Sequence, residues 1–137
     1  MGTRMSDAMC RVLVVEDQPD IREMLGELFA HEGLPFVMVE NGSTMRRALE
    51  TDEVDVALID VVLPGEETGL ALAEEVASRG IPPILVTGNP GYFTAVERSG
   101  HRFLFKPYRV ASLLKMIDQV LRESRCDAKK RVSGSHV

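Results

Sequence analysis

Five short apolar runs, separated by stretches of helical periodicity, are the feature that most constrains how this chain can fold. The runs are rich in β-branched residues, and three of them are nearly continuous in apolar character, as in strands covered on both faces of a parallel sheet. They occupy residues 11–15, 35–39, 56–60, 83–87 and 102–106. The alternation predicts a doubly wound α/β fold, in which a five-stranded parallel sheet has helices on both sides and right-handed crossovers.

The segments between the runs differ in how clearly they predict helices. Apolar residues at helical spacing predict helices at about 19–31, after an N-cap at Ser43 or Thr44, at 68–79 and at 109–123. The last of these has the most regular stripe, formed by Val110, Leu113, Leu114, Ile117 and Leu121. Between the fourth and fifth runs only about six residues between two glycines could be helical, so we expect a short or irregular fourth helix.

Composition limits the possible functions. The chain has 137 residues, 45% of them hydrophobic and 27% charged, which fits one globular domain without metal or disulfide support. Residues 11–123 are the expected domain, with a short tail at 1–10 and a tail at 124–137 that we expect to be disordered. The net charge of −5 argues against direct binding of nucleic acid.

The expected location is the cytoplasm. No apolar run is long enough to span a membrane, and the first residues lack a signal-peptide core. Cys10 and Cys126 lack the spacing of a metal or redox motif, so we expect both to be free thiols in a reducing compartment.

Polar residues end four of the five predicted strands. They are Glu16 and Asp17 after the first, Asp60 at the third, Thr87 at the fourth and Lys106 at the fifth. In a doubly wound fold the functional crevice lies beyond the carboxyl ends of the strands, so these side chains should meet there. Each alone has an ordinary explanation as a loop residue, a helix cap or a strand former, but the combination predicts a site.

The predicted cluster of three carboxylates needs compensation. Two carboxylates about 4 Å apart repel by roughly 4 kcal/mol at an effective dielectric constant near 20. Lys106 can neutralise one charge, and a divalent cation can neutralise the remaining two. Oxygen ligands in small number suit Mg²⁺, which prefers to bind beside phosphate oxygens. No Ser-His-Asp set, Cys-His set or Gly-rich phosphate loop is present, so the nucleophile is sought among the acids. Asp60 is the best candidate because it ends the central, most buried predicted strand, where a carboxylate can attack phosphorus.

These residues together resemble the receiver domain of two-component response regulators. The motifs are E-D at 16–17, D-V-V-L-P-G from Asp60, V-T-G at 86–88 and F-K-P-Y at 105–108, and they extend over roughly residues 11–123. Asp17 precedes Asp60 by 43 residues and Lys106 follows it by 46, so the spacing is specific. The resemblance implies a CheY-like, flavodoxin-like sheet in the order 2-1-3-4-5.

The resemblance also implies a role for each residue of the site. Asp60 would be the phosphoacceptor, while Thr87 and Lys106 would bind the phosphoryl group. Mg²⁺ would be held by Glu16, Asp17, Asp60 and the backbone carbonyl of Val62. Phe103 would be the switch aromatic that responds to Thr87, and Pro107 would follow a cis bond that aims the lysine.

Such a protein would be a signalling switch rather than an enzyme in the ordinary sense. A sensor histidine kinase or a histidine phosphotransfer protein would be its partner, a homodimer could form, and an unidentified protein would be the downstream target. The chain would act alone by protein contact or be a receiver excised from a longer regulator. A pseudo-receiver that is not phosphorylated is the main alternative, since the presence of the acids does not prove phosphorylation.

Departures from the family pattern lie around the phosphoacceptor and the fourth helix. The loop after Asp60 is about one residue longer than usual and carries Glu66 and Glu67, and Thr87 and Lys106 are only 19 residues apart. Val62 is apolar where a side chain would face the phosphoryl group, so we predict slow hydrolysis of that group.

Two other classes of protein are disfavoured. Val62 argues against a related phosphatase, which would need an acid at that position, and E-D-Q-P-D after the first strand argues against a flavin-binding loop.

Overall fold

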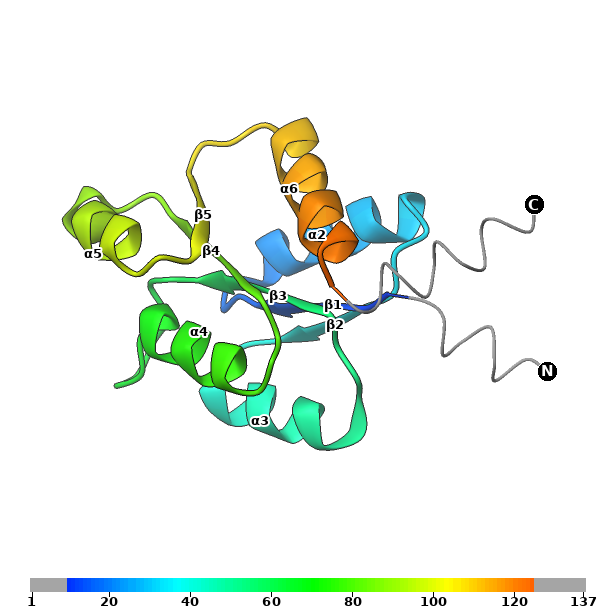
Figure 1. The fold of residues 1–137 in the computed structure, drawn as a ribbon, viewed down its shortest axis with the longest axis horizontal. Coiled ribbons are helices and arrows are strands. Elements are labelled where there is room, and N and C mark those ends of the chain that lie inside the picture. The colour runs from blue at the N-terminus through cyan, green and yellow to red at the C-terminus, as the bar shows by residue number, and fades with distance from the viewer. Residues whose placement is uncertain (1–9, 125–137) are drawn as a thin grey trace.

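The computed structural model describes residues 10–124, which form a parallel five-stranded sheet between two layers of helices (Figure 1). The order across the sheet is β2-β1-β3-β4-β5, and every neighbouring pair is parallel. The strands are β1 (Val12–Val15), β2 (Phe36–Val39), β3 (Val56–Asp60), β4 (Pro83–Thr87) and β5 (Arg102–Phe105). The helices are α2 (Pro19–His31), α3 (Gly42–Thr51), α4 (Gly69–Ser78), α5 (Phe93–Arg98) and α6 (Val110–Arg122), with a 3₁₀ turn η1 (Pro90–Tyr92). The predicted fold and strand order are confirmed.

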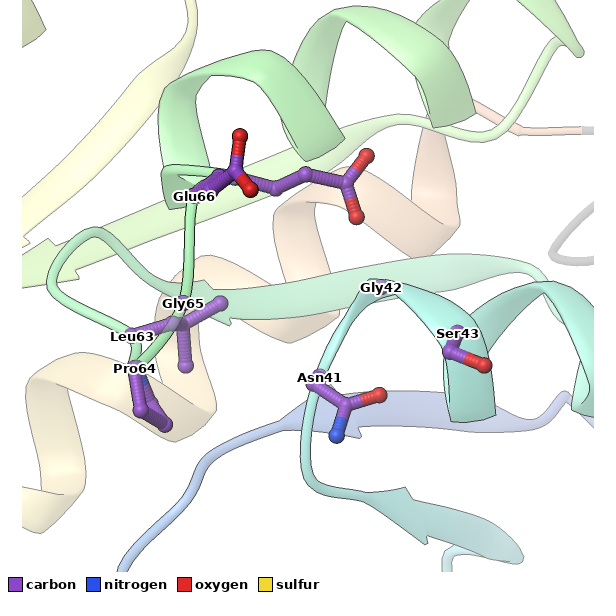
Figure 2. Close-up of a pocket in the computed structure, with 8 residues that line it drawn as sticks. Asn41, Gly42, Ser43, Leu63, Pro64, Gly65 and Glu66 are labelled. Atoms are coloured by element: carbon purple, nitrogen blue, oxygen red, sulfur yellow. The ribbon is translucent and has the colours of Figure 1, made fainter.

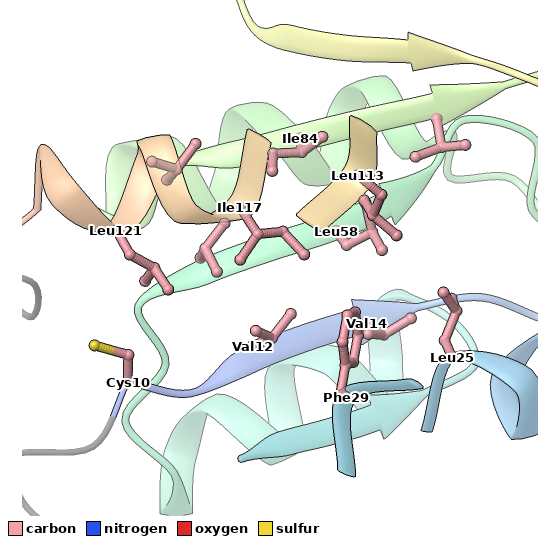
Figure 3. Close-up of a cluster of buried hydrophobic side chains, with 13 residues drawn as sticks. Cys10, Val12, Val14, Leu25, Phe29, Leu58, Ile84, Leu113, Ile117 and Leu121 are labelled. Carbon is pink, nitrogen blue, oxygen red and sulfur yellow. The ribbon is translucent and has the colours of Figure 1, made fainter. Parts of the chain in front are cut away.

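Alternation along the strands produces two separate cores. Val12 and Val14 point to the face covered by α2 and α6, whereas Leu13 and Val15 point to the face covered by α3, α4 and α5. Figure 3 shows the first core, to which α2 contributes Leu25 and Phe29 and α6 contributes Ile117 and Leu121. Burial on both faces explains why the central strands read as continuous apolar runs.

Two details of the helices correct the sequence analysis. The N-cap of α3 is Asn41, not Ser43 or Thr44, because the Asn41 side chain accepts from the Thr44 N–H at 2.9 Å while the Thr44 hydroxyl accepts from the Asn41 N–H at 3.0 Å. Val110, expected to face inward, is 45% exposed because it is the first residue of α6 and lies before the buried stripe begins.

The fourth helical segment is short, as predicted. It consists of η1 followed directly by the six residues of α5, and Val96 is the only buried residue of that helix. A segment with so little buried surface has few contacts opposing its displacement.

The structure tests only part of what the sequence predicts for the two ends of the chain. Cys10 is disulfide-bonded rather than free, which corrects the expectation for this residue, and Cys126 lies outside the described residues. The expected tails also fall almost entirely outside residues 10–124. Within that range, every helix is too short or too polar to cross a bilayer.

Candidate functional site

The polar residues predicted to converge at the carboxyl edge of the sheet do so. Glu16 directly follows β1, Asp60 ends β3, Thr87 ends β4 and Lys106 directly follows β5. Because β1, β3, β4 and β5 are parallel neighbours, their ends lie at one edge. The site is therefore assembled by the sheet register, which rigid strands hold in place.

Three carboxylates form the centre of this edge. Glu16, Asp17 and Asp60 each offer an oxygen, and these oxygens all lie within 4.8 Å of one another. Glu16 and Asp60 are buried, at 4% and 9% exposure, whereas Asp17 is partly exposed. Buried carboxylates cannot all be charged without a partner, and a compact set of hard oxygen donors fits a divalent cation such as Mg²⁺.

The pKa of Glu16 shows how burial and neighbouring charges act within the cluster. The pKa of its carboxyl is raised from 4.5 to about 7, chiefly by burial and also by the neighbouring Asp60 charge. The backbone N–H of Gln18, which donates to Glu16 Oε2 at 3.1 Å, and the nearby Lys106 ammonium act in the opposite direction. Without a cation, Glu16 therefore retains a proton over much of the range below neutral pH.

Lys106 partly neutralises the cluster. Its Nζ lies 3.1 Å from Asp60 Oδ2 and 3.9 Å from Glu16 Oε1. Burial lowers the pKa of this ammonium, but the charges of Asp60 and Glu16 outweigh burial and leave the pKa raised. The peptide bond between Lys106 and Pro107 is cis, as the resemblance implied.

Thr87 and Val62 occupy the rim around Asp60. Thr87 is 1% exposed, and its hydroxyl oxygen accepts from the Asn89 N–H at 3.1 Å. The Val62 N–H donates to Asp60 Oδ1 at 3.0 Å, while the Val62 side chain is 44% exposed. Both oxygens of Asp60 thus have a donor, one from Val62 and one from Lys106.

Phe103 lies farther from the edge, on β5. It is half-buried and packs against the core on the α3, α4 and α5 side of the sheet. Its ring stacks on Phe105, with ring centroids 4.9 Å apart.

The sequence analysis missed three residues that shape the site. Arg22 donates from Nη1 to the backbone carbonyl of Glu16 at 2.8 Å and so fixes the loop that carries the first two acids. Gly69 lies so close to β3 that an added Cβ would sit 2.1 Å from the Asp60 carbonyl oxygen. Tyr108 lines a small cavity together with Glu16, Asp60 and Lys106, and burial raises the pKa of its phenol. Of these three residues, only Tyr108 belongs to a motif identified in the sequence, F-K-P-Y.

A wider hollow of about 460 Å³ lies beside the loop that follows Asp60. Figure 2 shows the loop residues Leu63, Pro64 and Gly65 on one side and the turn at Asn41, Gly42 and Ser43 on the other. Glu67, from the same loop, is bound by Arg46 of α3, which also binds Glu75 of α4 at 2.8 Å. The acidic loop is therefore tied to the neighbouring helices.

The strand order, the three carboxylates and the lysine beside the central acid define an acidic, lysine-containing site on a doubly wound α/β domain. The family of response regulator receiver domains matches residues 12–118. The chain belongs to this family.

Curated relatives agree with the family. The chain is 31% identical to the transcriptional activator protein PfeR of Pseudomonas aeruginosa over 121 residues, covering 85% of this chain and 39% of that protein. It is 30% identical to the transcriptional regulatory protein GlrR of Escherichia coli, covering 88% of this chain and 28% of that protein. It is also 30% identical to the sensory transduction protein RegX3 of Mycolicibacterium smegmatis, covering 83% and 51% respectively. The chain thus spans between about a quarter and a half of the length of these relatives.

Solved structures show the same fold. The receiver domain of the response regulator TorR is 27% identical with a TM-score of 0.73, covering 82% of this chain and 96% of that one. The response regulator TrrA of Thermotoga maritima, solved in complex with Mg²⁺-BeF, is 28% identical with a TM-score of 0.73, covering 82% and 100%. This chain is therefore a receiver domain in both sequence and structure.

Proposed function

We propose that this receiver domain is a phosphorylation switch that accepts a phosphoryl group on Asp60 with the help of Mg²⁺. The observation that carries the proposal is the position of the Asp60 carboxylate, which is buried, lies beside two further carboxylates and is 3.1 Å from Lys106 Nζ. A purely structural ion pair would not need Glu16 and Asp17 beside it.

The side chains would divide the chemistry as follows. An Asp60 oxygen attacks phosphorus and forms the new P–O bond, while the bond from phosphorus to the donor atom breaks and its electron pair leaves with the donor. Lys106 and the Thr87 hydroxyl donate to the phosphoryl oxygens. Glu16, Asp17, Asp60 and the Val62 carbonyl would hold Mg²⁺, which when bound supplies positive charge to the phosphoryl oxygens.

The transferred group then changes the electrostatics of the edge. An aspartyl phosphate adds about −1.5 to −2 charge and new acceptor oxygens beside Lys106 and Thr87. The response is expected to begin at Thr87, and the resemblance to the family implies Phe103 of β5 as the aromatic residue that follows it. Such a change would bias a surface between two states.

We assign the upstream and downstream roles by family membership. The donor would be a sensor histidine kinase or a histidine phosphotransfer protein in the cytoplasm, and a homodimer is one form the activated protein could take. PfeR and GlrR carry names of transcriptional regulators, so an output through transcription is a proposal for any longer protein that contains this domain. Beyond its own phosphorylation and slow dephosphorylation, we propose no catalysis.

Phosphorylation can be tested directly. The protein is incubated with acetyl phosphate and Mg²⁺, and its intact mass is compared with that of Asp60→Asn and of Asp118→Asn, where Asp118 is an exposed acid on α6 that serves as a matched control. We expect a mass increase of one phosphoryl group in the wild type and in Asp118→Asn but not in Asp60→Asn. An unmodified wild type under conditions that phosphorylate another receiver would instead identify a pseudo-receiver.

A further inference from the structure

Three phenylalanine rings connect β5 to α5 on one face of the sheet. The rings of Phe93 and Phe105 are stacked, with centroids 4.0 Å apart and planes inclined by 21°. Phe105 in turn stacks on Phe103 at 4.9 Å. Phe105 is therefore the central ring of the three, and Phe93 is the one that belongs to α5.

The strand register places Phe105, rather than Phe103, beside Thr87. In the β4–β5 pairing, Thr87 is opposite Phe105, whereas Phe103 is opposite Leu85. Neighbouring strands are about 4.8 Å apart, and each pair of residues along a strand adds roughly 6.6 Å. Leu85 and Phe105 belong to the same core, and alternation puts Thr87 on that face as well. Phe105 is therefore the nearer of the two β5 rings to Thr87.

Thr87 is also joined to the segment before α5 by a hydrogen bond. Its hydroxyl oxygen accepts from the N–H of Asn89 at 3.1 Å, and the Asn89 side chain accepts from the Gly91 N–H at 2.9 Å. Asn89 caps η1, and η1 runs directly into α5 at Phe93. A rotation of the Thr87 hydroxyl toward the site would therefore break this hydrogen bond and change the side chain that is paired across the strands with Phe105.

Helix α5 is the element best placed to respond. It has six residues, of which only Val96 is buried, and Phe93 is half-buried against Phe105. The longer helices bury more: α2 buries Leu25 and Phe29, and α6 buries four residues, Leu113, Ile117, Val120 and Leu121. A change at Thr87 meets the least resistance where the fewest buried contacts must be broken.

We infer that Phe105 and Phe93 are the residues that transmit the state of Thr87 to α5, so that the surface of α5 reports what is bound at Asp60. This inference rests on the proposed phosphorylation switch and deepens it. It differs from the expectation drawn from the family, in which Phe103 alone would follow Thr87. Here, the neighbouring position on β5 that adjoins Thr87 is itself aromatic and is stacked on the helix.

The inference can be tested by NMR on the full chain with beryllofluoride and Mg²⁺ as a phosphoryl mimic. Amide shifts are followed at Val61 and Val62, which report the site, and at Thr94–Arg98, which report α5. The variants are Phe105→Leu and Phe93→Leu. Phe103→Leu tests the alternative that Phe103 is the aromatic residue that follows Thr87. Phe36→Leu on β2, the opposite edge strand, is the matched control.

We expect Phe105→Leu and Phe93→Leu to keep the shifts at Val61 and Val62 while the shifts along α5 fall at least about twofold. Phe103→Leu and Phe36→Leu should retain most of the α5 response. Because Phe93 is half-exposed on a peripheral helix, Phe93→Leu should fold even if Phe105→Leu does not. Wild-type α5 shifts in the folded variants, or their loss in Phe103→Leu alone, would overturn the inference. A wild type with no response at Val61 and Val62 would instead show that the proposed function itself fails.

Discussion

Glu16 is a carboxylate of the site whose pKa the fold raises strongly. Its pKa is raised from 4.5 to about 7, chiefly by burial, so the folded state holds this proton more tightly than the unfolded state. Below pH 4.5 the group is protonated in both states, so its ionisation does not change the free energy of unfolding. Between about 4.5 and 7 the unfolded state loses its proton first, so the free energy of unfolding falls as pH rises.

Glu16→Gln should remove this pH dependence. Glutamine keeps the shape and an acceptor for the Gln18 N–H but has no charge to bury. Without Mg²⁺ at pH 8, we expect the variant to be more stable than the wild type by about 1–3 kcal/mol, with little difference at pH 4. Urea unfolding at the two pH values measures this. Equal stabilisation at both values would attribute the effect to packing rather than to ionisation.

Val62 should limit hydrolysis of the phosphoryl group. Its side chain is 44% exposed beside Asp60 but is apolar, so it cannot orient an attacking water. We expect Val62→Asn to shorten the lifetime of the aspartyl phosphate roughly tenfold, because a positioned polar group assists the water. The decay of phosphorylated protein, followed by intact mass, is the measurement, and Val62→Ala is the apolar control. A wild-type lifetime of seconds that Val62→Asn leaves unchanged would contradict this role.

The residues at the strand ends were predictable because each follows a recognisable apolar run, and the register of a parallel sheet brings such positions together. Arg22 was not, since its role depends on reaching the Glu16 carbonyl from one turn inside α2. The pKa of Glu16 was also inaccessible, because it depends on how completely the folded chain excludes water from one carboxyl.

At the scale of elements, the start of α4 is pressed directly against the end of β3. The Gly69 N–H donates to the Val61 carbonyl at 2.8 Å, and a Cβ on Gly69 would sit 2.6 Å from Val61 Cα as well as 2.1 Å from the Asp60 carbonyl oxygen. The atoms that such a Cβ would meet are backbone atoms of Asp60 and Val61, so they cannot move aside without displacing Asp60, the proposed phosphoacceptor.

Gly69→Ala should therefore destabilise the fold by roughly 2–4 kcal/mol and lower the rate of phosphorylation by acetyl phosphate. Gly26→Ala in α2 is a matched control, because its Cβ would meet Phe36 at an ordinary 3.5 Å. That control should be stabilised by about 0.5–1 kcal/mol, since alanine favours a helix interior over glycine. Chemical denaturation of both variants measures the contrast, and similar stabilities would refute the close approach of α4 to β3.

The elements themselves show where sequence patterns reach their limit. The long helices α2 and α6 were predicted nearly to their ends because amphipathic periodicity is strong over 13 residues. The α5 segment was predicted only to be short, since six residues contain too little periodicity to indicate which side chains pack. Its aromatic stacking on β5 depends on tertiary contact and became visible only in the fold.

At the scale of the whole molecule, the acidic cluster makes stability depend on the cation proposed to bind there. A ligand that binds only the folded state raises the free energy of unfolding, by about 2.7 kcal/mol at a concentration one hundred times its Kd. For a domain of this size that corresponds to a rise in Tm of roughly 10 °C. Stability and the readiness for phosphorylation should therefore rise together with Mg²⁺.

Asp17→Ala separates two effects of the carboxylate cluster: repulsion within the metal-free fold and binding of Mg²⁺. The substitution removes one of three carboxylates whose oxygens lie within 4.8 Å, so the metal-free variant should be at least as stable as the wild type. It also removes a ligand, so the increase in Tm with Mg²⁺ should largely disappear. Asp20→Ala, which removes an exposed acid in the first turn of α2, should retain that increase. Thermal unfolding of the three proteins with and without Mg²⁺ makes the comparison.

If Asp17→Ala still shows the full rise in Tm with Mg²⁺, the cation binds elsewhere. If Asp17→Ala is less stable than the wild type without Mg²⁺, Asp17 supports the fold rather than the site.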